Sequence, residues 1–210
     1  MGRGSSGIGA GPYGAGMENG AGEAGTTIKS SNPLTDEIGK KGGGIYANDI
    51  MNTRDAMERE YGSAVKDLSL HVATFGDNSA LGAYGDNTVY MSKHVRNANL
   101  TQAMQAAANS GFHPGLGGKS GAEAVSAHEI SHHLGQVAAK KAGISEQEIV
   151  ARAASKMGIK TENMAGHISK YARTNFSETI AEAGADVHCN GAKAAKASIA
   201  IMSEVKSILK

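Results

Sequence analysis

The chain has 210 residues, with 21 basic and 20 acidic side chains, one cysteine and no tryptophan. Because the charges nearly cancel, a protein that wraps nucleic acid is disfavoured, and the single Cys189 excludes an internal disulfide framework. No apolar run is long enough for a membrane helix, and the first residues lack the apolar stretch of a secretory signal, so we expect neither membrane insertion nor export by that route.

Glycine is concentrated at the N-terminus. Residues 1–44 hold 14 of the 29 glycines. They also hold few large apolar side chains, so this segment cannot bury enough surface to offset the entropy of ordering it. We therefore predict a flexible arm over residues 1–44 and one folded domain over residues 45–210.

The first part of the folded domain is predicted to contain one helix and three short strands. Asn48 can cap a helix that runs to about residue 64. Residues 68–75 alternate between apolar and polar side chains, residues 80–84 form a weaker strand, and residues 88–91 follow a Gly-Asp-Asn turn. These strands predict a small antiparallel sheet.

The remainder of the chain is predicted to be helical. Helices are expected over residues 100–108, 122–142, 145–157 and 161–173, from Asn175 onward, and over residues 192–209. One helix, then strands, then a mainly helical half predicts an α+β fold, with the small sheet packed on the long 122–142 helix.

A metal-binding pattern lies in the long predicted helix. His128, Glu129 and His132 form His-Glu-x-x-His, and residues at i and i+4 share one helical face, so the two imidazoles can bind one metal ion. Glu129 lies beside them and can take a proton from a water at the metal, which is the arrangement of a zinc hydrolase. His133 is turned off that face, and we interpret it as a packed or supporting histidine.

A catalytic zinc normally has three protein ligands, so a third must come from elsewhere in the chain. The candidates are an acidic side chain, His167, His188 or Cys189. Among the acids, Glu178 and Glu182 lie at i and i+4, so one could bind the metal while the other holds the far nitrogen of a ligating histidine. Both could equally just favour the start of a helix through capping and the helix dipole.

Two segments together, residues 128–132 and 171–183, resemble a zincin of the gluzincin type. The nearer resemblance is to the catalytic domain of anthrax lethal factor, and similar domains occur in phage head-associated and bacterial toxin proteins. The resemblance covers residues 65–188 but is specific only in these two segments. Ser131 stands where the family often has glycine, and Gly184 lies among positions where it usually has bulky aromatic side chains.

The resemblance implies roles for the downstream segment. Its first glutamate, which falls on Glu178, supplies the third metal ligand, and its second, on Glu182, supports a metal-bound histidine. Its tyrosine, on Tyr171, lies over the metal and stabilises the transition state. Residues 88–91 would be the edge strand to which an extended peptide substrate adds.

The function implied by this resemblance is zinc-dependent hydrolysis of peptide bonds by an endopeptidase, with Glu129 as general base and a peptide or protein as substrate. The alternative is a phage virion structural or assembly protein that keeps the fold as a scaffold and contacts other virion proteins through the arm. Glu129 favours the enzyme, because a scaffold needs no general base. We expect a cytoplasmic or virion-associated protein with no nucleic-acid or membrane partner.

Overall fold

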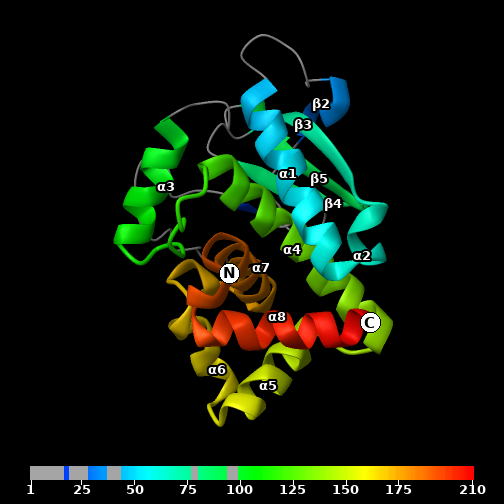
Figure 1. Cartoon of the computed structure of the whole chain (residues 1–210). Helices are drawn as coiled ribbons and strands as arrows, with labels where there is room; N and C mark the ends of the chain where they lie inside the picture. The colour runs from blue at the N-terminus through cyan, green and yellow to red at the C-terminus, as the bar shows by residue number, and fades with distance from the viewer. Residues whose placement is uncertain (1–16, 19–27, 37–43, 77–79, 94–98) are drawn as a thin grey trace, which may run out of the picture.

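A computed structural model describes residues 17–18, 28–36, 44–76, 80–93 and 99–210 of the chain. A small sheet lies at one end of the molecule, and helices are layered beneath it (Figure 1). The predicted α+β class is confirmed, because every strand ends before residue 93 and the described elements from residue 99 onward are all helical.

The sheet has five strands in the order β1-β4-β5-β3-β2. The strands are β1 (Met17–Glu18), β2 (Ile28–Pro33), β3 (Ser69–Phe75), β4 (Gly82–Gly85) and β5 (Thr88–Ser92). The α-helices are α1 (Gly44–Tyr61), α2 (Ser63–Lys66), α3 (Asn99–Asn109), α4 (Gly121–Ala142), α5 (Glu146–Met157), α6 (Thr161–Met164), α7 (Phe176–Asn190) and α8 (Lys196–Leu209). Short 3₁₀ turns are η1 (Leu34–Asp36), η3 (Ala165–His167), η4 (Tyr171–Arg173) and η5 (Gly191–Lys193).

The sheet is mixed, so the prediction of an antiparallel sheet is wrong for part of it. Strands β4 and β5 form an antiparallel hairpin whose turn residues Asp86 and Asn87 have φ values of 50° and 57°, as a tight two-residue turn requires. Strand β5 then pairs in parallel with β3 and lies between β3 and β4. Residues 88–91 are therefore an interior strand rather than the predicted edge, because their side chains Val89 and Met91 are fully buried in the core.

Part of the predicted N-terminal arm belongs to the fold. Strand β2 pairs antiparallel with β3, and Leu34 directly after it is buried in the main core. Met17–Glu18 pair in parallel with β4. The structure thus places residues 17–18 and 28–36 of the predicted arm in the sheet or against the core, while residues 1–16, 19–27 and 37–43 lie outside the described part of the chain.

The predicted helix over residues 161–173 is interrupted. Helix α6 ends at Met164, and two separate 3₁₀ turns follow. The amides of Lys170 and Tyr171 donate to the carbonyls of Gly111 and Phe112, at 2.9 and 3.1 Å, instead of to carbonyls one turn earlier. These long-range bonds replace the helical ladder and bring the 111–113 loop against the Tyr171 turn.

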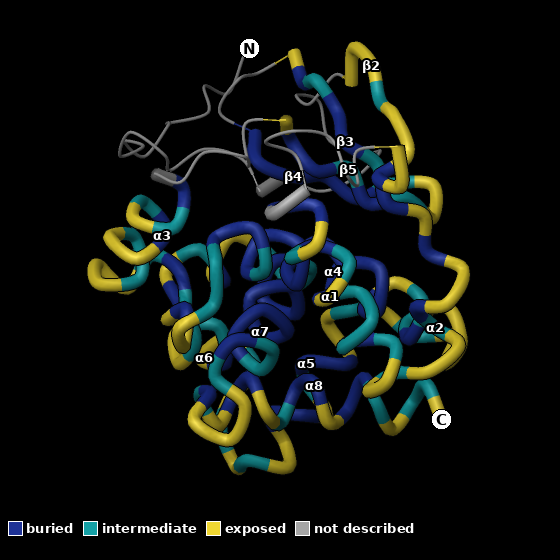
Figure 2. Tube along the Cα trace, turned by 45° about the horizontal axis from the view of Figure 1, so that its top comes forward, coloured by how far each residue is buried: buried dark blue, intermediate teal, exposed yellow. Residues whose placement is uncertain are grey.

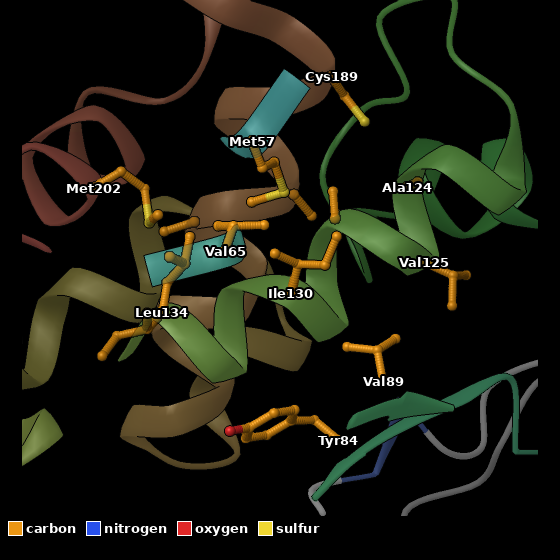
Figure 3. Packing of buried hydrophobic residues seen from close by; sticks show 14 of the residues in the cluster. Met57, Val65, Tyr84, Val89, Ala124, Val125, Ile130, Leu134, Cys189 and Met202 are labelled. Atoms are coloured by element: carbon orange, nitrogen blue, oxygen red, sulfur yellow. The ribbon is translucent and has the colours of Figure 1, made fainter. Parts of the chain in front are cut away.

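Helix α4 is the centre of the molecule. It lies between the sheet and α7, and both helices are largely buried (Figure 2). On its sheet side, Val125 and Ile130 lie near Val89 of β5, and Leu134 continues the same core toward α8 (Figure 3). This packing holds α4 from both sides and therefore fixes the positions of His128, Glu129 and His132.

Candidate metal centre

Helix α4 presents two pairs of polar side chains to two different neighbours. His128 and His132 lie at i and i+4 and face α7, while Glu129 and His133, each one residue further along, face β4. On β4, alternation of side chains brings Gly82 over Glu129 and Tyr84 over His133. The two candidate ligands, His128 and His132, therefore lie on one face of α4, and the candidate base Glu129 lies on the adjacent face.

Three ligand atoms from α4 and α7 converge. The Nε2 atoms of His128 and His132 are 3.1 Å apart, and Glu178 Oε2 lies 3.1 Å from the first and 3.6 Å from the second. All three side chains are buried, and of the described residues they form the one group of this kind able to hold a metal ion. The structure therefore brings together the three predicted ligands, although they come from helices far apart in the sequence.

The hydrogen bond that each imidazole forms through Nδ1 shows which of its nitrogens is available to a metal ion. His128 Nδ1 lies 3.0 Å from Glu182 Oε1, which can only accept, so this nitrogen carries the proton. His132 Nδ1 lies 3.0 Å from Ser177 Oγ, whose hydroxyl donates to Glu146 at 3.3 Å, so this nitrogen also donates. In the neutral tautomer that these bonds select, each imidazole therefore presents the lone pair of its Nε2 to the space between the two rings.

Two bare nitrogens and a carboxylate oxygen that face one another repel unless a cation lies among them. Glu178 Oε2 is buried and, apart from the approach of His128 Nε2 to 3.1 Å, has no hydrogen-bond partner within the described chain. The donor set is two neutral imidazoles and one carboxylate, a set that suits a divalent transition metal. The residues present therefore fit a bound metal ion.

The electrostatics point the same way. Burial lowers the pKa of His128, but Glu178 and Glu182 outweigh it and raise this pKa to about 10, so a proton occupies the site when no metal is bound. Burial and the charge of His128 lower the pKa of His132 well below its usual value and keep it neutral. Burial alone would raise the pKa of Glu182, yet His113 and His128 hold it at about 2, so this carboxylate stays charged.

Glu129 is buried with no partner. Neither carboxylate oxygen forms a hydrogen bond to any described group. Burial raises the pKa of Glu129 to about 8; the charge of His128 lowers it and that of Glu178 raises it further. A Cβ on Gly82 would lie 2.5 Å from Glu129 Oε1, so only glycine fits over this carboxylate. Strand β4, rather than the predicted 88–91 strand, therefore borders the candidate base.

Tyr171 lies on the α7 side of the centre. Its ring centroid is 6.1 Å from that of His128 and 5.2 Å from that of His113. The side chain is half-buried and belongs to the η4 turn that precedes α7. The predicted tyrosine is thus next to a candidate ligand, in reach of the space beside it.

The other candidate ligands lie elsewhere. His133 accepts from the Tyr84 hydroxyl at 2.9 Å and donates to the Ala64 carbonyl, which confirms that it is a packed residue. His167 is exposed on η3, and neither His188 nor Cys189 joins the converging group. Burial raises the pKa of the Cys189 thiol to about 12, so this sulfur is a packed, protonated group.

Sequence reasoning missed three residues that support the centre: His113, Ser169 and Ser177. His113 and Ser169 donate to Glu182, and Ser177 accepts from His132. The signal that could have found His113 is its place in the glycine-rich loop just before α4. No sequence pattern predicts the contacts of Ser169 and Ser177. Both serines reach the centre only because α7 and the segment before it pack against α4.

Comparisons with protein-family models, with curated proteins and with solved structures gave no match. None of the described helices combines the length and apolarity needed to cross a membrane. The geometry of the centre is therefore the main evidence for what this chain does.

Proposed function

We propose that this chain is a zinc-dependent peptidase of the zincin type, with zinc held by His128, His132 and Glu178. The observation that carries the proposal is the convergence of three bare ligand atoms next to a buried, unpartnered carboxylate. Tetrahedral zinc with nitrogen and oxygen ligands at about 2.0–2.2 Å keeps its ligand atoms about 3.3–3.6 Å apart. Of the observed separations, 3.6 Å falls within that spacing and the two of 3.1 Å lie just below it, so a small outward movement of the ligand atoms would admit zinc.

The chain's own residues supply the acid–base chemistry. Glu129 accepts a proton from the attacking water and returns it to the leaving amine, a role that suits a buried carboxylate with no other hydrogen-bond partner in the described chain. Tyr171 donates its phenol hydrogen to the oxyanion that forms from the peptide carbonyl. Zinc, when bound, acidifies water and polarises that carbonyl. Glu182 and Ser177 hold the two imidazoles in the tautomer that leaves Nε2 free.

Metal analysis tests the first half of the proposal. Purified wild-type chain should contain about one zinc per molecule, and a His128→Ala/His132→Ala variant should contain none. His71→Ala is the matched control, because His71 lies in strand β3 and pairs with Ser31. Stoichiometric zinc in the double variant would contradict the proposed ligands.

A peptide-library cleavage assay tests the second half. Glu129→Gln keeps the size of the side chain but removes the base, so zinc and folding should survive while cleavage is lost. Tyr171→Phe should keep zinc and lower kcat by about 10²–10³, because only a transition-state hydrogen bond is lost. A wild type that binds zinc but cleaves no peptide would instead favour a scaffold that retains the metal.

A further inference from the structure

Glu182 joins more than one part of the centre. Its Oε1 accepts from His128 Nδ1 at 3.0 Å, and His113 Nδ1 lies 3.1 and 3.2 Å from its two oxygens. Its Oε2 also accepts from Ser169 Oγ at 2.7 Å. The three hydrogen bonds hold this fully buried carboxylate and its donors in place, because moving any donor would leave part of a buried charge unpaired. The other two donors, His113 and Ser169, are not among the proposed metal ligands.

Those two donors belong to segments that are bound to each other. Backbone bonds join residues 111–112 to residues 170–171, and the amide of Ala172 donates to Ser169 Oγ at 3.0 Å. Lys170 Nζ adds a bond to the carbonyl of Ser110 at 2.8 Å. The loop that carries His113 and the turn that carries Tyr171 therefore form one unit, anchored to Glu182 on both sides.

The side chains of this unit also pack together. The His113 ring lies 5.2 Å from the Tyr171 ring at 58°, and Phe112 lies 4.9 Å from His113 and 5.6 Å from Tyr171. His113 is buried, whereas Tyr171 is half-buried and borders His128. The imidazole of His113 thus contacts Glu182 through its Nδ1 and Tyr171 through its ring.

We propose that His113 is a positioning residue that holds the Tyr171 ring beside His128 by linking it to the buried carboxylate of Glu182. The inference rests on the proposed function, in which Tyr171 stabilises the oxyanion. A displacement of about 1 Å in such a donor can cost about 10²-fold in rate without any change in metal binding. Glu182 therefore orients both a metal ligand and, through His113, the transition-state donor.

Two substitutions separate the two contacts of His113. His113→Asn retains an N–H donor near the position of Nδ1 but removes the ring, and His113→Phe retains a ring but removes the donor. Each should lower kcat by up to about 10²-fold with KM and zinc content unchanged. In a Tyr171→Phe background the same substitutions should lower kcat little further, because the donor that they position is already gone. The matched control is His167→Asn, at an exposed histidine, which should behave as wild type in both backgrounds.

A spectroscopic readout makes the test independent of activity. In zinc-loaded protein labelled with 3-fluorotyrosine, one of six tyrosine resonances disappears in Tyr171→Phe and so identifies Tyr171. That resonance should shift in His113→Asn and stay in place in His167→Asn. An unmoved resonance, or an equal loss of kcat in both backgrounds, would overturn the inference. If the wild type cleaves no peptide, the proposed function fails, and the fluorine spectrum still reports whether the environment of Tyr171 depends on His113.

Discussion

The two sides of the candidate metal centre are built differently, although each presents a histidine from the same helix. On one side, His128 donates to Glu182, a charged carboxylate buried among three donors. On the other side, His132 donates to the neutral hydroxyl of Ser177 at 3.0 Å. This hydroxyl in turn donates to the Glu146 carboxylate at 3.3 Å. The His-Glu-x-x-His pattern does not distinguish the two histidines. The packing does, because it places the charged Glu182 behind His128 and the neutral Ser177 behind His132.

This difference follows from where α7 crosses α4. Ser177 lies in the first turn of α7, next to α5, and Glu182 lies in its buried middle. A carboxylate on the far nitrogen makes a ligating imidazole more basic and holds it more firmly than a hydroxyl does. Substitutions on the two sides should therefore have unequal effects on zinc affinity.

Among substitutions of the residues that support the ligands, the largest effect is expected from Glu182→Ala. Zinc affinity should fall about 10–100-fold, because His128 loses its support. The free energy of unfolding should fall by about 3–5 kcal/mol, because buried donors lose their charged partner. Chelator competition and urea unfolding measure the two quantities. A Glu182→Ala variant with unchanged zinc affinity would show that the buried carboxylate serves folding alone.

Gly184→Ala should affect both sides at once. A Cβ at Gly184 would lie 1.8 Å from Ser131 Oγ, so α7 must move away from α4. We expect a loss of about 1–3 kcal/mol in stability and weaker zinc binding. The cost should shrink in a Ser131→Gly background, because the obstructing side chain is gone.

This pair of substitutions also bears on the resemblance. Ser131 and Gly184 are two positions where the sequence departs from the zincin pattern, and they contact each other. Thermal unfolding of the four proteins in the cycle measures the coupling between them. An equal cost of Gly184→Ala in both backgrounds would mean that the helices do not approach as closely as described.

A smaller effect is expected from Ser177→Ala. His132 then loses a neutral acceptor, which is worth about 0.5–1.5 kcal/mol and a correspondingly modest loss of zinc affinity. Ser203→Ala on the exposed face of α8 is the matched control. If Ser177→Ala weakens zinc more than Glu182→Ala does, the order of the two sides is reversed.

The smallest effect on zinc is expected from removing residues 1–27, since the described residues of that segment, Met17–Glu18, supply none of the converging ligands. Removing residues 1–44 should instead destabilise the fold, because it deletes β2 and the buried Leu34, whose apolar contacts are worth about 2–5 kcal/mol. Zinc titration and thermal unfolding of both truncations check the difference. Equal stability of the two would show that β2 contributes nothing to the fold.

The sequence by itself determined the parts of the site that depend on local geometry. The i, i+4 spacing of His128 and His132 fixes their shared face on any helix, and the same spacing joins Glu178 to Glu182 on α7. Helix α7 begins after Asn175 as predicted, and the Asn175 side chain caps it by accepting from the Glu178 amide at 2.8 Å. These features involve residues within one or two helical turns, so they can be predicted from a single segment.

The tertiary structure decided what depends on contacts between segments. Spacing alone left the roles of Glu178 and Glu182 open, and only the crossing of α4 and α7 places one among the ligand atoms and the other behind His128. The parallel pairing of β5 with β3 and the bonds that interrupt the 161–173 helix join distant residues. His113 reaches Glu182 for the same reason. Local patterns do not encode such pairings, because a hydrogen bond between distant segments forms only after the core has brought them together.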